Sequence, residues 1–194
     1  MSGEIEPAWA SRGALKLLAA LDAFGLSPAG APAADLGASV GGFVDVLVRG
    51  GAEPVYAVDT AYGQLAWTLR QDPRVVVMER TNAVHTDPPP GAAAACGVVS
   101  VDLGWTKQDR ALPAALKWCR PGGHVVTLVK PHYESGKHKL GDDEAREVAQ
   151  AVAEGLPRIA AGAGAPAELL GCVESPIRGG KGKNLEVLAV LRRQ

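Results

Sequence analysis

The chain has 194 residues, enough for one domain with its own hydrophobic core and too few for two ordinary domains. Hydrophobic residues make up 47% and charged residues 21%, which excludes a disordered chain or a fibre, and the net charge of −1 provides no general attraction to nucleic acid. No apolar run approaches the ~20 residues of a membrane span, and the acidic, polar start resembles no targeting peptide, so we expect a cytoplasmic protein without a membrane partner.

Short apolar runs alternate with helical patterns, which predicts βαβ units and a mostly parallel sheet. Ser11 is the expected N-cap of a first helix whose leucine stripe ends near Gly25. We expect strands at 33–36, 55–58, 75–78, 98–103, 125–129, 169–173 and 185–191, and helices at 43–49, 64–70, 110–118 and from 142 onward. The predicted fold is α/β, a doubly wound Rossmann-like sheet of about seven strands with the last antiparallel. It forms a single domain over residues 1–194, with 1–10 as a flexible tail.

A glycine-rich turn, DLGASVGG at residues 35–42, joins the first predicted strand to the helix after it. Doubly wound sheets bind ligands at the carboxyl ends of their strands, and glycine lets the backbone approach a ligand closely. The second strand ends at Asp59, whose carboxylate is suited to accept hydrogen bonds from two ribose hydroxyls. The arrangement predicts a nucleoside site, although such a turn can also serve only to pack a helix on a strand.

The spacing of this turn matches neither the dinucleotide fingerprint G-x-G-x-x-G nor the P-loop G-x-x-x-x-G-K-[ST]. The carboxylate of Asp35, just before the turn, would repel a pyrophosphate. It would suit a cofactor that carries an amino group and a sulfonium charge. The turn therefore favours S-adenosyl-L-methionine over NAD.

The chain resembles the FtsJ-like RNA methyltransferases, most closely the TlyA (haemolysin A-like) branch. The resemblance lies in residues 11–17, 35–45, 55–59, 62–67, 69–75, 78–82, 112–113, 128–134 and 184–186. It implies a domain that transfers a methyl group from S-adenosyl-L-methionine to a ribose 2′-hydroxyl of ribosomal RNA. The cofactor contacts that it implies are Asp35, Gly37, Ala38, Ser39, Gly41, Gly42, Phe43, Asp59, Glu79 and Asp102.

The catalytic pattern of that family, lysine–aspartate–lysine–glutamate, falls on Lys16, Asp102, Lys130 and Glu186. The alcohol in such a reaction must lose its proton as it attacks. A lysine titrates near ~10.4, and nearby cations or a dry pocket lower that value towards a usable base. Lys130 is the expected base or hydroxyl-orienting group, with the other three tuning it. Taken singly, Lys16 could snorkel from an amphipathic helix and Asp102 could form a turn or cap a helix.

The expected partner is RNA, either ribosomal RNA or a ribosomal subunit, since two basic segments offer a local docking site. The RNA-binding candidates are Arg12, Lys137, Lys139, Arg178, Lys181 and Lys183, although basic loops are often merely solvated. Only ten residues precede Ser11, so we expect the S4 RNA-binding domain usual in the TlyA branch to be absent. Residues 103–108, LGWTKQ, also depart from the family pattern where the acceptor should bind.

Two alternatives stay open on this evidence. The first is a methyltransferase for a small hydroxylated metabolite, with Trp105 and the altered segment after Asp102 lining the pocket. The second is a non-catalytic cofactor-binding module associated with the ribosome. We expect no metal, because the four histidines share no ligand spacing, and the three cysteines predict buried free thiols.

Overall fold

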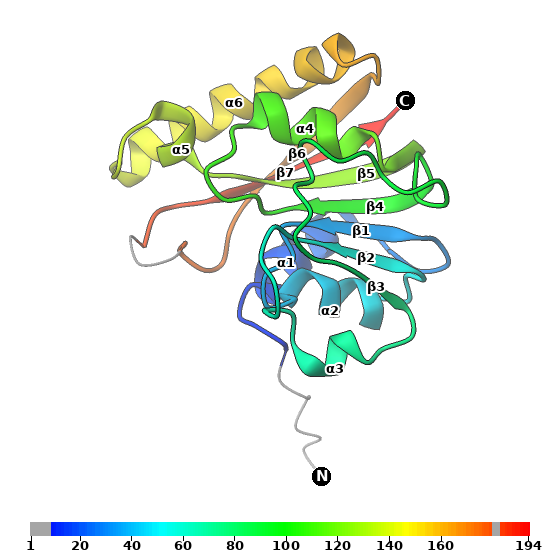
Figure 1. Ribbon diagram of the computed structural model, residues 1–194. Coiled ribbons are helices and arrows are strands. Elements are labelled where there is room, and N and C mark those ends of the chain that lie inside the picture. The colour runs from blue at the N-terminus through cyan, green and yellow to red at the C-terminus, as the bar shows by residue number, and fades with distance from the viewer. Residues whose placement is uncertain (1–8, 180–182) are drawn as a thin grey trace, which may run out of the picture.

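The computed structural model describes residues 9–179 and 183–194 and contains one seven-stranded sheet (Figure 1). The order across the sheet is β3-β2-β1-β4-β5-β7-β6. The strands are β1 (Ala33–Leu36), β2 (Val55–Val58), β3 (Val75–Met78), β4 (Cys96–Val101), β5 (Cys119–Val129), β6 (Ala167–Glu174) and β7 (Val187–Arg193). β1 to β5 pair in parallel, and β7 runs antiparallel to both of its neighbours. The predicted α/β sheet with an antiparallel last strand is confirmed.

The helices cover both faces of this sheet (Figure 1). They are α1 (Ala14–Phe24), α2 (Gly42–Arg49), α3 (Trp67–Arg70), α4 (Gln108–Leu116), α5 (Pro131–Ser135) and α6 (Asp142–Gly162). One buried cluster packs α1 and α2 on the sheet around Leu17 and Leu47, and the other packs α4 and α6 around Leu112 and Leu156. β1, β2 and β4 are buried along their whole length because they are covered on both faces. No helix in the described part of the chain is both long and apolar enough to cross a membrane.

Several predicted boundaries differ from the observed ones. The N-cap of α1 is Gly13, and Ser11 lies two residues earlier, where its Oγ accepts a hydrogen bond from the Gly13 N–H at 3.2 Å. β5 begins six residues before its predicted start because Cys119 pairs with Cys96 ahead of a register shift. β7 begins at Val187, so Glu186 lies just before the strand, and Cys172 is exposed although we expected a buried thiol.

Candidate active site

The carboxyl ends of five strands surround a cavity of about 470 Å³, called here the main cavity. Such an edge is where doubly wound sheets bind their ligands. It is lined by Gly37 and Ser39 after β1, Val58, Asp59, Thr60 and Gln64 at and after β2, residues 81–84 after β3, residues 102–106 after β4 and Lys130 after β5.

One part of the glycine-rich turn faces the main cavity, and the other part packs α2 against its neighbours. Gly37 has a φ of +99°, and a Cβ there would lie 2.8 Å from the carbonyl carbon of Asp102, so only glycine lets these two segments meet at the cavity wall. A Cβ on Gly41 would lie 2.8 Å from Leu65, and one on Gly42 would lie 2.8 Å from the Ala14 nitrogen. Gly41 and Gly42 do not line the main cavity and allow α2 to pack against its neighbours.

Asp59 is fixed by two backbone donors at the cavity wall. The Ser39 N–H donates to Oδ2 and the Ala61 N–H donates to Oδ1, each at 2.7 Å. A carboxylate oxygen can accept more than one hydrogen bond, so both oxygens keep capacity for a ligand. This geometry ties the turn after β1 to the end of β2.

Four other predicted cofactor residues lie off the main cavity. Ala38 is buried in the core, and Phe43 is buried there as part of α2. Glu79 accepts a hydrogen bond from the Gly63 N–H at 2.7 Å and pairs with Arg70, and the hydrogen bond from Arg70 holds the pKa of Glu79 below its usual range. Asp35 lies inside the sheet, 1% exposed.

Burial changes the chemistry expected of Asp35. Loss of solvation, reinforced by the negative charges of Asp102 and Asp59, raises the pKa of Asp35 to about 8, although a hydrogen bond from Ser100 Oγ at 2.8 Å opposes the shift. Asp35 was expected to act on the cofactor through its negative charge, whereas its side chain is buried in β1, favours the protonated form and lies off the main cavity.

Residues 81–84, after β3, also form part of the cavity wall, although no site residue was predicted there. Asn82 Oδ1 accepts a hydrogen bond from the Val84 N–H at 3.0 Å, which holds this segment in a turn. Its position directly after a predicted parallel strand was the signal available in the sequence, because neighbouring strand ends meet at one edge.

The four residues predicted to form the catalytic set come together beside the main cavity. Lys16 Nζ lies 2.6 Å from Glu186 Oε2 and 3.7 Å from Asp102 Oδ2. The other oxygen of Asp102 pairs with Lys130 Nζ, which also donates a hydrogen bond to the Leu103 carbonyl at 3.3 Å. The order of contacts is Glu186–Lys16–Asp102–Lys130, called here the ionic chain.

Burial makes the ionic chain more than a surface network. Lys16 is 8% exposed and Glu186 4%. Buried charges are tolerated when each has a partner, and two lysines here alternate with two carboxylates. Lys130 and Asp102 also line the main cavity, so one end of the ionic chain faces the space where a ligand would bind.

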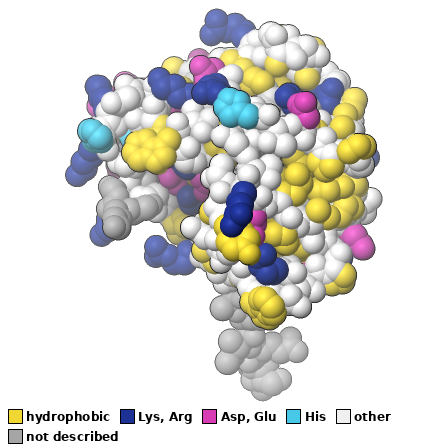
Figure 2. Space-filling model, viewed as in Figure 1, with side chains coloured by type: hydrophobic (Ala, Val, Ile, Leu, Met, Phe, Trp, Pro, Cys, Tyr) yellow, Lys and Arg dark blue, Asp and Glu magenta, His cyan; other side chains and the backbone are white. Residues whose placement is uncertain are grey.

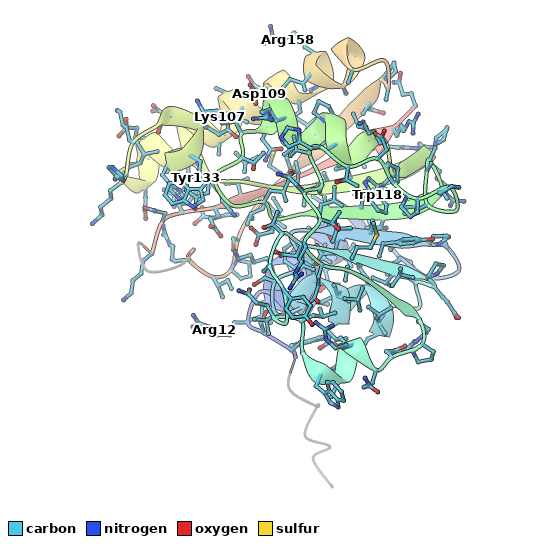
Figure 3. All side chains as sticks on the ribbon, viewed as in Figure 1. Arg12, Lys107, Asp109, Trp118, Tyr133 and Arg158 are labelled. Atoms are coloured by element: carbon cyan, nitrogen blue, oxygen red, sulfur yellow. The ribbon has the colours of Figure 1, made fainter. Side chains whose placement is uncertain are left out.

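A second cavity of about 440 Å³, the aromatic cavity, shares Trp105 with the main one. Its other lining residues are Lys107, His132, Tyr133, Gly136, Lys137, His138 and Asn184. Trp105 is 82% exposed, has a φ of +55° and stacks on Tyr133 with ring centres 4.8 Å apart. Burial lowers the pKa of His132; the charge of Glu186 opposes this shift, and the charge of Lys130 adds to it. Figure 3 shows Tyr133 and Lys107 on the same side of the molecule, near α5 and the start of α4.

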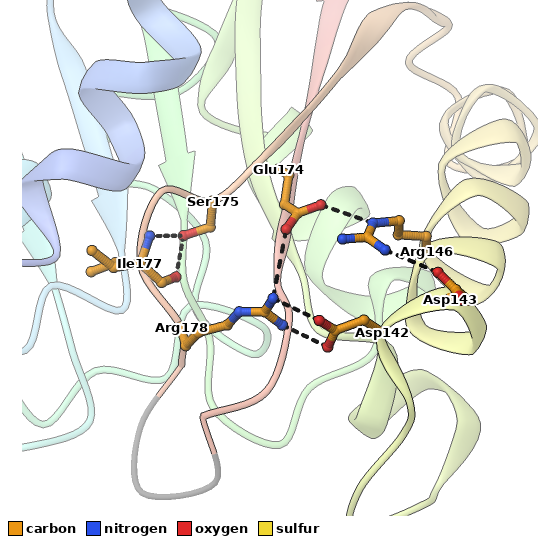
Figure 4. A network of polar contacts seen from close by, with 7 residues as sticks. All are labelled: Asp142, Asp143, Arg146, Glu174, Ser175, Ile177 and Arg178. Atoms are coloured by element: carbon orange, nitrogen blue, oxygen red, sulfur yellow. Dashed lines mark hydrogen bonds and ion pairs between the residues drawn. The ribbon is translucent and has the colours of Figure 1, made fainter.

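The six RNA-binding candidates differ in what they contact. Arg12, Lys139 and Lys183 are exposed, and Lys181 lies outside the described residues. Arg178 binds both oxygens of Asp142 at 2.8 Å (Figure 4), and Lys137 Nζ lies 2.5 Å from Glu144. On the face shown in Figure 2, lysine and arginine side chains are spread in several small groups. Among the described residues, no three His, Cys, Asp or Glu side chains gather as a metal-binding group.

Comparisons with known proteins identify the family of the chain. The model of the FtsJ-like methyltransferase family matches residues 9–192. The chain is 47% identical over 136 residues to the 16S/23S rRNA (cytidine-2′-O)-methyltransferase TlyA of Mycobacterium tuberculosis, covering 70% of this chain and 50% of TlyA. It is 38% identical over 181 residues to YqxC of Bacillus subtilis, covering 93% of this chain and 64% of YqxC.

A solved hemolysin-like protein of Streptococcus thermophilus superposes with a TM-score of 0.85 at 36% identity, covering 99% of this chain and 69% of that one. The chain thus spans between one half and two thirds of the curated relatives' lengths. The family model spans nearly the whole chain, and a relative at 38% identity matches 93% of it. The chain belongs to the FtsJ-like methyltransferases.

Proposed function

We propose that the protein transfers a methyl group from S-adenosyl-L-methionine to a ribose 2′-hydroxyl of ribosomal RNA. The observation that carries the proposal is the ionic chain, because it brings Lys130 and Asp102 to the wall of the main cavity. The name of the M. tuberculosis relative supports the class of acceptor.

The residues of the main cavity fit the cofactor. Its volume lies in the range of about 300–1,000 Å³ typical of ligand pockets. Gly37 leaves the backbone open at the wall, and Asp59 offers two oriented acceptors suited to the paired hydroxyls of a ribose. The cofactor, when bound, supplies an electrophilic methyl group attached to a sulfonium centre.

The chain's own contribution is to position the acceptor hydroxyl and assist loss of its proton. We assign Lys130 Nζ to contact that hydroxyl, since it lines the main cavity. Asp102 holds Lys130 through one oxygen and faces Lys16 through the other, while Glu186 fixes Lys16. Groups held by such contacts keep their geometry during the reaction, and a well-positioned nucleophile reacts faster.

The aromatic cavity supports a nucleotide as the acceptor. Trp105 stacks on Tyr133 but remains largely exposed beside the main cavity, and aromatic faces stack on unpaired bases whatever their sequence. Lys107 and Lys137 line the same space and offer charges for a phosphate backbone.

The test is to incubate the purified protein and labelled S-adenosyl-L-methionine with ribosomal subunits, free ribosomal RNA and a metabolite extract in parallel. Label recovered as a 2′-O-methylnucleoside from one of the RNA samples supports the proposal. Label only in the metabolite fraction would replace RNA by a small acceptor, and no label in any sample would overturn the assignment of activity.

A further inference from the structure

Glu186 lies at the end of the connection between β6 and β7. Backbone hydrogen bonds join the described parts of this connection to each other. The Ser175 N–H donates to the Glu186 carbonyl at 2.9 Å. The Gly179 N–H donates to the Asn184 carbonyl at 3.0 Å, and these two residues form an isolated antiparallel bridge. Gly179 therefore lies at a fixed place beside the end of this connection.

The space next to Gly179 is occupied by the Glu186 carboxyl group. A Cβ at position 179 would lie 2.5 Å from Glu186 Cδ and closer still to Oε1. Gly179 is buried, and it is not among the glycines with a positive φ. The requirement for glycine here is one of space and not of backbone conformation.

Both Glu186 and the backbone at Gly179 are held in place by other contacts. Glu186 is 4% exposed and its Oε2 is held 2.6 Å from Lys16 Nζ. The backbone at 179 follows Arg178, whose guanidinium binds both oxygens of Asp142 at the start of α6 (Figure 4). Bidentate arginine–carboxylate pairs are geometrically specific, and Arg178 thereby anchors the loop beside Glu186.

Further ion pairs around Arg146 and Glu174 add to the contact between Arg178 and Asp142. Arg146 on α6 contacts Glu174 at 3.0 Å and Asp143 at 3.1 Å, and Glu174 lies 4.0 Å from Arg178 (Figure 4). The network joins the end of β6, the loop and the first turn of α6. It explains why Arg178, a candidate RNA contact from its sequence, is engaged within the protein.

We infer that Gly179 is a positioning residue for Glu186: the absence of a side chain at 179 creates the space in which the Glu186 carboxylate reaches Lys16. A methyl group at this position displaces the carboxylate and opens the ionic chain at its buried end. The consequence for turnover rests on the proposed function, whereas the displacement itself does not.

The first test is the crystal structure of Gly179→Ala, with Gly162→Ala as the matched control because a Cβ at 162 meets nothing within 4 Å. The expected result is that Glu186 leaves Lys16, with no oxygen within 4.0 Å of Nζ, while the control keeps the contact. An unchanged Lys16–Glu186 contact in Gly179→Ala overturns the inference, whatever the activity of the protein.

The second test is kinetic. Gly179→Ala should lower kcat by roughly ten- to a hundredfold, the effect of a misplacement of about 1 Å, with the cofactor Kd unchanged. Gly179→Ala/Glu186→Ala should be no slower than Glu186→Ala alone, because the added methyl group then has no carboxyl group to displace. Additive losses would overturn the inference, whereas a wild-type protein that methylates no RNA would overturn only the proposed function.

If Gly179→Ala does not fold, the same substitution made together with Glu186→Ala tests whether the two side chains compete for one space. Removing the carboxylate leaves room for the added methyl group, so Gly179→Ala/Glu186→Ala should fold with the Tm of Glu186→Ala. Failure of the double variant to fold, when Glu186→Ala folds, would overturn the inference.

Discussion

Asp35 makes the stability of this protein depend on pH in a direction opposite to that of most carboxylates. Burial raises the pKa of Asp35 from an ordinary 3.8 to about 8, so above pH 4 the folded chain keeps a proton that the unfolded chain has released. The stability associated with the neutral acid is complete below about pH 4 and is lost as the pH rises towards 8. Asp35→Asn should remove this dependence, because the amide is neutral at every pH.

The size of the effect follows from the pKa difference between the folded and unfolded chains. Each pKa unit is worth about 1.4 kcal/mol, so a rise from 3.8 to about 8 corresponds to at most about 6 kcal/mol in the free energy of unfolding. Domains are stable by only about 5–15 kcal/mol, so even half of this difference would be readily measured.

The assay is urea denaturation of wild type and Asp35→Asn at pH values from 5 to 9, with Asp22→Asn on the exposed side of α1 as the control. The variant's advantage in unfolding free energy should grow with pH up to about 8 and then level off, and the control should follow the wild type. Parallel curves for wild type and Asp35→Asn would refute the assignment of a protonated Asp35.

Two further variants test the proposed cofactor contact and the proposed acceptor contact. Asp59→Ala should weaken binding of S-adenosyl-L-methionine by roughly a hundredfold, since two hydrogen bonds to a charged acceptor are worth about 1.5 kcal/mol or more each. Calorimetric titration measures this Kd, and an unchanged Kd would remove Asp59 from the cofactor site. Trp105→Ala should raise the KM for RNA by about tenfold or more, because stacking on one base is worth ~1–3 kcal/mol, with cofactor affinity unchanged. Steady-state kinetics measures the second effect, and an equal loss of cofactor affinity would count against Trp105 as an acceptor contact.

Much of the fold could be predicted from local patterns. Short β-branched runs such as Val75–Met78 favour strands, and the acidic first turn of α6 marks its start. Boundaries were less accurate where tertiary contacts decide them, as at Cys119, whose pairing with Cys96 lengthens β5. The order of strands in the sheet is likewise a consequence of packing and follows the general rules for parallel crossovers.

In the site too, residues marked by local sequence patterns could be predicted, and contacts between distant residues could not. Lys130 and Asp59 were identifiable because a charged residue directly after an apolar strand is unusual, and the family resemblance supplied Lys16 and Glu186, 170 positions apart. The sequence carried no sign that burial raises the pKa of Asp35 or that Arg178 is bound to Asp142, because both depend on neighbours distant along the chain. The contact of Gly179 with Glu186 is similarly visible only in three dimensions.

The most direct test of the central claim is methyl transfer by wild type and Lys130→Ala, with the product digested to nucleosides and the position of the methyl group mapped by mass spectrometry. The account predicts a ribose 2′-O-methylnucleoside from the wild type. It also predicts a loss of at least about a hundredfold in Lys130→Ala, the usual contribution of a group that assists proton loss, with cofactor affinity within about threefold of wild type. Methyl groups on bases would contradict ribose methylation, and full activity without the Lys130 amine would contradict the role of Lys130.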